Sequence, residues 1–284
     1  MIDKPPAMTS HDVVDAVRRA LSTRKVGHAG TLDPMATGVL LVGVGRATRL
    51  LRFLADLPKA YQGTARLGVQ TDTLDAQGAV VRTVEVAVER ASLDAAVGAL
   101  VGDSDQRPPA YSAVKVGGRK LYEAARAGER LEAKARPIRV EEFEIERFAS
   151  PEVDFRVTCS SGTYVRVLLA DVGTALGCGA HLTRLVRTRI GPFGLTAAVT
   201  PTDLGDPLPL EAAVAHLPRI DLHPEEAIAA SHGRILAPAG IQGPYGVFAP
   251  DGHLVGVYRD AASRAQPEVI LAPAAPPGAP TPIA

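Results

Sequence analysis

The spacing of apolar residues changes abruptly between positions 153 and 176, and this change limits the folds open to the chain. Apolar and polar side chains alternate over residues 153–159, as expected for a half-buried β-strand. After the turn residues Ser160-Ser161-Gly162, apolar side chains recur at helical spacing from about Tyr164 to Leu176. Strands and helices are mixed along the chain without regular alternation or an internal repeat. We therefore expect an α+β fold rather than a doubly wound sheet.

The same reasoning predicts further elements. Helices are expected at about Asp12–Leu21 and from Ser92 onward, and strands at Val39–Val44, Ala60–Val69 and Val80–Val88. Residues 103–136 are polar, basic and irregular around one short helix near Leu121–Arg126. An insert of that length within a compact domain is usually functional or mobile.

Composition divides the chain into three parts. We predict a main domain at 1–219, a small β-rich module at 220–273 and a disordered tail at 274–284. Glycines separate short strands in the module, whereas the tail consists mainly of Pro, Ala and Gly. The module resembles a PUA-type RNA-binding module in position and pattern. It carries three basic and six acidic side chains, which makes a strong grip on phosphates doubtful.

Charge is distributed unevenly although the totals balance. Lys+Arg and Asp+Glu each number 31, so the formal net charge is zero. Residues 105–139, however, hold nine basic and four acidic side chains. A polyanionic partner would therefore bind at particular surfaces rather than everywhere. Two cysteines are too few for a disulfide scaffold, and there is no apolar run of transmembrane length or signal peptide, so we expect a cytoplasmic location without membrane contact.

Residues 27–38, Gly-His-Ala-Gly-Thr-Leu-Asp-Pro-Met-Ala-Thr-Gly, are the most informative segment. Pro34 disfavours helical backbone at Asp33, and the glycines permit tight turns and the close approach of a ligand. The segment presents a single carboxylate on a shaped loop before an apolar strand. From the residues alone, Asp33 is either a turn-forming side chain or a functional carboxylate.

This segment closely resembles the catalytic loop of the TruB-type tRNA pseudouridine synthases, written Gly-His-x-Gly-x-Leu-Asp-Pro-x-Ala-Thr-Gly. Other segments match that family's motifs in the same order: Asp3-Lys4-Pro5, Tyr61 with Ala65-Arg66-Leu67-Gly68, Thr71-Asp72-Thr73 with Asp75, Pro109 with Tyr111-Ser112-Ala113, Lys115, Lys120-Leu121-Tyr122, Ser161-Gly162-Thr163-Tyr164 with Arg166, and Cys178-Gly179-Ala180-His181-Leu182. A series that extends from Asp3 to Leu182 makes a chance match negligible, unlike a single motif.

The resemblance implies a pseudouridine synthase fold with a mixed, largely antiparallel sheet, and Asp33 as the catalytic carboxylate. The reaction detaches uracil at N1, turns it and rejoins it through C5. It is redox-neutral, so the resemblance implies no cofactor. A carboxylate can serve as nucleophile or base, and the sequence leaves both routes open. Arg166 is expected beside Asp33, where it would keep the carboxylate ionised, and Tyr61 is expected to stack on the flipped base.

The resemblance also implies binding residues around this carboxylate. Tyr164 would be a second aromatic side chain of the pocket, Leu185 a pocket wall, and His28 would fill the space that the base leaves. Asp75 is either a contact near the pocket or a solvated loop acid. The other residues expected to bind substrate are Lys4, Lys115, Lys120, His181, Arg184 and Arg187, several of them through phosphates. Cys178 and His181 are spaced like metal ligands, but no second pair completes a tetrahedral site, so no metal is expected.

The implied function is isomerisation of uridine 55 in the T-arm of tRNA, after base flipping, by a monomer that needs no guide RNA. Two alternatives stay open. One is a tRNA-binding or RNA-folding chaperone without catalysis. The other is a relative that modifies a different RNA or depends on a guide RNA.

Overall fold

The computed structural model describes residues 1–129 and 131–271, so the tail expected at 274–284 lies outside the described residues. The chain forms two compact units. Among the described residues, unit 1 comprises Met1–Val17, Gly30–Leu41 and Ala55–Asp203, and unit 2 comprises Arg18–Ala29, Val42–Leu54 and the residues from Leu204 to Leu271. Two N-terminal segments therefore belong with the C-terminal residues, which differs from the simple division expected at residue 219.

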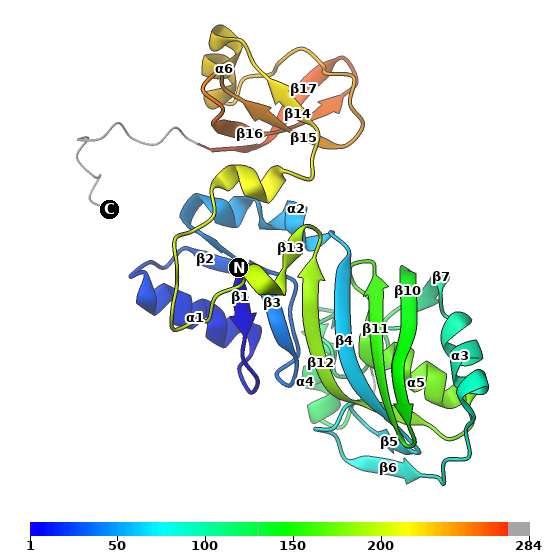
Figure 1. Ribbon diagram of the computed structural model, residues 1–284. Helices are drawn as coiled ribbons and strands as arrows, with labels where there is room; N and C mark the ends of the chain where they lie inside the picture. The colour runs from blue at the N-terminus through cyan, green and yellow to red at the C-terminus, as the bar shows by residue number, and fades with distance from the viewer. Residues whose placement is uncertain (130, 272–284) are drawn as a thin grey trace. The chain divides into compact units, whose positions relative to one another are not determined.

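A long mixed sheet forms the centre of unit 1 (Figure 1). Its strands lie in the order β1-β3-β12-β4-β11-β10-β7. Their bounds are β1 Ile2–Lys4, β3 Thr37–Val44, β12 Ala180–Ile190, β4 Lys59–Leu67, β11 Glu152–Cys159, β10 Arg136–Ala149 and β7 Gly102–Gln106. Neighbours are antiparallel except β3 and β12, which are parallel. The expected mixed, largely antiparallel sheet is confirmed.

Shorter elements complete the connections. β2 (Val26–Ala29) pairs with β3, and β13 (Phe193–Gly194) pairs with β12. Two small hairpins are formed by β5 (Val69–Thr71) with β6 (Val80–Thr83), and by β8 (Lys115–Val116) with β9 (Arg119–Lys120). The short helices are α2 (Leu51–Ala55), α4 (Leu121–Arg126) and the 3-10 turns η1 (Gly45–Arg49), η2 (Leu195–Ala197) and η3 (Leu210–Val214).

Helices α3 (Arg90–Gly98) and α5 (Val165–Ala175) bury their apolar faces in the main core of unit 1. Leu93 of α3, Leu168 and Val172 of α5, and Phe155 of β11 belong to one buried cluster. Burial of each such side chain contributes roughly 1.5–3 kcal/mol. Helix α1 (Ser10–Ala20) begins one turn after β1 and buries Ser10 with three valines. The core therefore fixes the strands and helices that carry the site.

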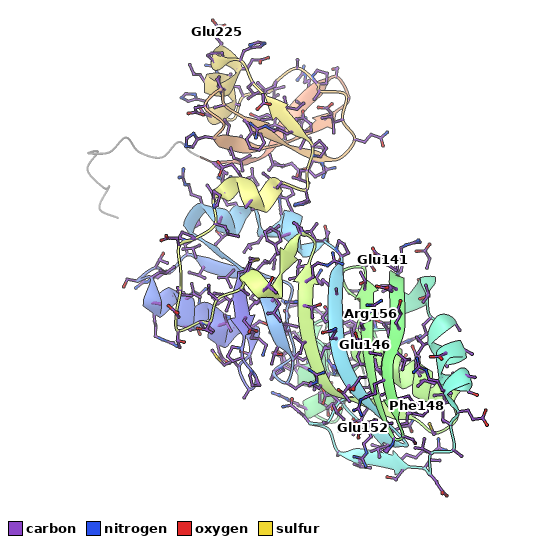
Figure 2. The ribbon with its side chains drawn as sticks, in the orientation of Figure 1. Glu141, Glu146, Phe148, Glu152, Arg156 and Glu225 are labelled. Carbon is purple, nitrogen blue, oxygen red and sulfur yellow. The ribbon has the colours of Figure 1, made fainter. Side chains whose placement is uncertain are left out.

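The face of the main sheet opposite this buried core carries charged side chains that pair with one another. The pairs are Arg66 with Glu152, Arg147 with Asp154, and Arg156 with Glu142 and Glu144. Figure 2 shows Arg156 and Glu146 on the neighbouring strands of this face. Exposed ion pairs contribute little to stability. Because carboxylates balance the cations here, this face offers little attraction to a polyanion.

Unit 2 contains a sheet in the order β14-β15-β16-β17, as the expected β-rich module requires. The bounds are β14 Arg219–Asp221, β15 Pro244–Phe248, β16 Leu254–Ala261, β17 Arg264–Ile270 and helix α6 Pro224–Ser231. Leu50, Val214, Phe248 and Val257 share one of its cores, so buried apolar contacts join the segment around Leu50 to the C-terminal strands. Among the described residues, no helix is long and apolar enough to cross a membrane.

Several sequence-based expectations are confirmed and others are corrected. The short helix expected near Leu121–Arg126 is α4. The helix expected to be capped by Ser92 begins at Arg90, and the strand expected to reach Val88 ends at Thr83. The expected insert is shorter than predicted, because β7 and β10 extend from both sides into the main sheet.

Candidate active site

Asp33 lies in the turn that connects β2 to β3. The Ala36 amide donates to the Asp33 carbonyl at 3.0 Å, which closes a four-residue turn with Pro34 at its second position. Proline favours that position because its ring fixes the backbone angle that the turn requires. The Asp33 side chain keeps 39% of its surface accessible. The local sequence therefore presents a carboxylate to solvent from a rigid turn.

Hydrogen bonds hold this turn on both sides of Asp33. The Leu32 amide donates to the hydroxyl of Ser10 at 2.9 Å, and that hydroxyl lies 3.2 Å from the Leu32 carbonyl. On the other side, the Pro34 carbonyl accepts from the Ala7 amide at 3.1 Å and from Lys4 Nζ at 3.2 Å. The carboxylate is thus held in place before any substrate binds, as catalysis by a fixed group requires.

Lys4 is a structural tie rather than the expected substrate contact. Its side chain is completely buried, and its ammonium group also donates to the carbonyls of Pro5 at 3.0 Å and Met8 at 2.6 Å. With the Pro34 carbonyl, these acceptors use all three ammonium donors. Burial lowers the pKa of Lys4 to about 8, although the nearby Asp33 opposes the shift. A phosphate cannot reach this group without breaking the turn.

Arg166, in the first turn of α5, joins three loops. Its Nε atom lies 2.9 Å from Asp33 Oδ2, a proximity that the family resemblance implied. Its Nη1 donates to the Thr73 carbonyl at 2.7 Å, and its Nη2 donates to the Tyr111 carbonyl at 3.0 Å. Only 4% of its side chain is exposed. The guanidinium fork therefore fixes the turn that carries Asp33, the loop after β5 and the start of the insert relative to one another.

The charge state of Asp33 reflects opposing effects. Burial raises the pKa of Asp33 above its ordinary value, the Arg166 guanidinium lowers it, and the Asp75 carboxylate raises it again. The net direction is upward. Arg166 does favour the ionised form as expected, but it only partly offsets the combined effect of partial burial and the nearby Asp75 carboxylate.

Asp75 is a buried loop residue rather than a solvated acid. Its Oδ1 accepts from the Thr73 hydroxyl at 2.7 Å and from the Gln77 amide at 3.0 Å. Its Oδ2 lies 3.7 Å from Arg166 Nη1. Asp75 therefore acts on the site through Arg166 and through its charge near Asp33.

A cavity of about 450 Å³ opens beside Asp33. The expected residues Tyr61, Tyr164, Arg166 and Leu185 line it together with Asp33. Tyr61 lies on β4 between β11 and β12, so strand pairing on both sides fixes its position. Burial raises the pKa of Tyr61, so its phenol stays protonated. Two aromatic rings and a carboxylate thus converge on one space of a size suited to a small planar group.

Two further residues shape this cavity and were not predicted from the sequence. Gln106 at the end of β7 is buried, and its side-chain amide binds the backbone of Tyr164 twice, through the Tyr164 amide at 2.7 Å and the Tyr164 carbonyl at 3.2 Å. Lys59 is also buried and donates to the carbonyls of Ala55 and Leu57 at 2.8 Å each. Burial lowers the pKa of Lys59 to about 8. Gln106 fixes the base of α5, and Lys59 adds a cation to the cavity wall.

Arg187 differs from its expected role as a phosphate contact. Only 1% of it is exposed, and its guanidinium donates to the carbonyls of Val39 at 2.7 Å and Gly30 at 2.9 Å. Arg187 therefore holds the loop around Gly30 through hydrogen bonds, and it is not accessible to solvent. The pairing of β12 with β3 is also tight here, since a Cβ atom on Gly38 would lie 2.3 Å from the Arg187 carbonyl oxygen.

The remaining expected binding residues lie apart from the cavity wall. Lys115 on β8 is exposed, and Lys120 pairs with Glu123 at 3.7 Å. Arg184 on β12 is exposed too, but its Nε lies 3.4 Å from the Thr64 hydroxyl, on the charged face of the sheet. His181 is buried with its Nδ1 2.9 Å from the Val69 carbonyl, so its present contact is structural. His28 lies on β2 in unit 2 and is half-buried. The described residues contain no group of three or more His, Cys, Asp or Glu that could hold a metal ion.

Comparison with known proteins places these features in context. The description "TruB family pseudouridylate synthase (N terminal domain)" matches residues 18–165, and "tRNA Pseudouridine synthase II, C terminal" matches residues 217–272. "tRNA pseudouridylate synthase B C-terminal domain" matches residues 166–208. A "tRNA pseudouridine synthase B" of Mycobacterium sp. (strain KMS) is 49% identical over 96% of both chains. That of Thermobifida fusca (strain YX) is 48% identical over 96% of this chain and 97% of its own.

Solved structures are similar as well. The crystal structure of a Cbf5-Nop10-Gar1 complex contains a chain that matches with a TM-score of 0.73 and 30% identity, over 91% of this chain and 76% of that one. The structure of an H/ACA RNP bound to a substrate RNA containing 2'-deoxyuridine matches with a TM-score of 0.74 and 26% identity, over 96% of this chain and 84% of that one.

Proposed function

From the premise that this chain belongs to the TruB family of pseudouridylate synthases, we propose that Asp33 drives the isomerisation of uridine 55 in the T-arm of tRNA. The chain is a tRNA pseudouridine synthase, an isomerase. The comparisons contain no support for a chaperone without catalysis. The observation that carries the residue assignment is the contact of 2.9 Å between Asp33 Oδ2 and Arg166 Nε at the edge of a cavity lined by two tyrosines.

The substrate base must leave its stack to reach Asp33, because a stacked uridine exposes neither its glycosidic bond nor C5 to a carboxylate in a cavity. Flipping costs a few kcal/mol. In our proposal, stacking on Tyr61, of the order of 1–3 kcal/mol, offsets much of that cost. Tyr164 and Leu185 complete the walls, and Gln106 holds Tyr164 in position. Lys115 is exposed and suited to contact a phosphate near the flipped nucleotide.

The chemical step needs an ionised Asp33, whether the carboxylate attacks the sugar or removes a proton from it. The bond between C1' and N1 breaks, the uracil turns, and a bond forms between C1' and C5. The hydrogen at C5 leaves as a proton, and N1 carries one at the end. Arg166 holds the carboxylate toward the cavity and favours its charged form, while burial strengthens its interaction with developing positive charge on the sugar.

We further propose that the chain works alone, as a cytoplasmic monomer without guide RNA, and that its β-rich module is PUA-like. Support comes from relatives named tRNA pseudouridine synthase B, which match along nearly the whole of both chains. The expected result is activity on tRNA of the purified chain at its monomer mass, measured by light scattering, with no RNA besides the tRNA substrate and no second protein. Activity that requires a second component would contradict it.

The substrate assignment is tested with tRNA tritiated at uridine C5. Isomerisation expels that hydrogen, so the chain should release one equivalent of tritium per tRNA. A tRNA in which cytidine replaces uridine 55 should release none, and an isolated T-arm hairpin should be a substrate. Equal release from the substituted tRNA would refute the choice of uridine 55 while leaving the enzyme class intact.

A further inference from the structure

Unit 2 carries a strongly basic surface that the catalytic cavity does not use. Residues 18–29 contain three arginines, one lysine and no carboxylate, and residues 42–54 contain three arginines and no carboxylate. Two of these arginines are engaged with β17, since Arg52 pairs with Glu268 at 2.7 Å and Arg49 donates to the Ile270 carbonyl. The cations at the end of α1 and the start of β2 are Arg18, Arg19, Arg24 and Lys25, which we name the α1–β2 basic surface. Arg18 is half-buried, and its Nη2 donates to the Val26 carbonyl at 3.0 Å.

The backbone between these cations is short and fixed. Ser22 adopts a left-handed conformation with φ of 48°, and the Ser22 and Thr23 amides donate to the carbonyls of Arg19 at 3.3 Å and Arg18 at 3.1 Å. This arrangement ends α1 and reverses the chain. The Lys25 carbonyl then accepts from the Gly45 amide at 2.7 Å. The cations therefore lie on a turn whose backbone conformation is defined by hydrogen bonds.

The side chains around this turn form an open hollow of about 580 Å³. It is lined by Arg18, Arg19, Ser22, Thr23 and Arg24. Arg19, Arg24 and Lys25 are exposed, and within residues 1–129 and 131–271 no ion pair joins any of these three to a carboxylate. Asp15, four residues before Arg19 on α1, can offset one of the charges. The hollow still combines guanidinium groups with two hydroxyls and an excess of positive charge.

This donor set matches the sugar–phosphate backbone of a nucleic acid. Guanidinium groups bind phosphate oxygens through paired hydrogen bonds, and serine and threonine hydroxyls are common additional donors. The contrast within unit 2 is sharp, because residues 220–273 carry three basic and six acidic side chains. Within unit 2, the end of α1 is therefore the segment best suited to bind a polyanion.

We propose that the α1–β2 basic surface is a second RNA-binding surface, which contacts backbone phosphates of the tRNA independently of base sequence. The inference rests on the proposed function only in taking tRNA as the polyanion. Such contacts increase affinity and orient the RNA, but they do not take part in the chemical step. Their signature is therefore a change in binding and in its salt dependence at a constant rate of isomerisation.

A matched pair of variants tests the surface. R19Q/R24Q removes two exposed arginine charges from the hollow, and R234Q/R264Q removes two exposed arginine charges elsewhere in unit 2. Glutamine preserves the apolar stem and is a good helix former, which suits Arg19 in the last turn of α1. Thermal unfolding of both variants should match that of the parent chain.

The measurements are the Kd for full-length tRNA between 50 and 200 mM salt, and the single-turnover rate of tritium release at saturating enzyme. For R19Q/R24Q we expect a Kd at least about fivefold higher at 0.1 M salt, and a salt slope reduced by about 0.7–0.9 per lost phosphate contact. The single-turnover rate should not change. R234Q/R264Q should leave all three quantities unchanged.

Repeating the binding with a T-arm hairpin locates the contact. A loss seen only with full-length tRNA would place the contact outside the T-arm, and a loss seen with both RNAs would place it within, and either supports the proposal. An unchanged Kd and slope in R19Q/R24Q, or an equal loss in R234Q/R264Q, would overturn it. Failure of the proposed function has a separate signature, which is absence of tritium release by the parent chain.

Discussion

Replacement of Arg166 by lysine tests the joining role of this residue. Lysine keeps the positive charge near Asp33, but its single ammonium group cannot reproduce a fork that contacts Asp33, the Thr73 carbonyl and the Tyr111 carbonyl at 2.9, 2.7 and 3.0 Å. The side chain is nearly inaccessible, so water cannot readily replace the lost donors.

The size of the effect follows from these contacts. A hydrogen bond from a charged group contributes about 1.5–3 kcal/mol. If lysine keeps the contact with Asp33 and loses the other two, about 3–6 kcal/mol of interaction disappears, shared between folding and catalysis. At 1.36 kcal/mol for each factor of ten, assigning half of it to the transition state predicts a loss of about 10- to 100-fold in the single-turnover rate. The rest should appear as a lower unfolding temperature.

The assay is single-turnover tritium release at saturating enzyme, with the Kd for tRNA and the thermal unfolding curve measured in parallel. Arg147→Lys is the matched control, because Arg147 is exposed and pairs with Asp154 at 2.8 Å on the charged face of the sheet. The control should change the rate less than about twofold, since exposed pairs contribute about 0–1 kcal/mol. A rate for Arg166→Lys within twofold of the parent, at unchanged stability, would refute the argument. It would mean that a positive charge near Asp33 suffices for the rate without the contacts to Thr73 and Tyr111.

Three further predictions concern residues around the site. Asp75→Asn removes the carboxylate that raises the pKa of Asp33, so the acid limb of the pH–rate profile should move to lower pH, and a shift to higher pH would contradict the stated cause. Gln106→Leu deletes two hydrogen bonds to the Tyr164 backbone. The increase in the Kd for tRNA and the decrease in the rate should together amount to about 5- to 100-fold. Circular dichroism should show unchanged secondary structure. Gly38→Ala places a Cβ atom 2.3 Å from a carbonyl oxygen at a φ of 98°, so urea unfolding should report a loss of more than about 2 kcal/mol, and a neutral result would show that β3 and β12 can separate freely.

The elements that the sequence predicted correctly have regular apolar spacing. The strand at 153–159 alternates without interruption and is β11, and the helix after it is α5. Strands β10 and β12 were not predicted, although they are long. Both contain β-bulges, between Val140 and Glu142 in β10 and between Leu182 and Arg184 in β12, and each bulge shifts the alternation by one residue. When the alternation of apolar and polar residues is interrupted in this way, the strand cannot be predicted from a period of two.

The cavity residues were predictable for a different reason. Asp33, Tyr61, Tyr164 and Leu185 belong to, or follow, family motifs in loops and strands, and the structure brings all four to one cavity with Arg166. The structural roles of Lys4 and Arg187 were not predictable, because cations are rarely buried and a sequence gives no sign of the carbonyl groups that surround them. Gln106 was missed because its partner is backbone, which carries no side-chain signal.

The most direct test of the account is tritium release from C5-labelled tRNA by Asp33→Asn. Asparagine matches the shape of aspartate, can still accept from Arg166 and leaves the turn with Pro34 intact, so the fold and the Kd for tRNA should be preserved. We predict that release falls by at least about 10⁴-fold, as for other enzymes that lose an essential catalytic group. Release at more than a hundredth of the parent rate, with tRNA still bound, would contradict the central role of the Asp33 carboxylate.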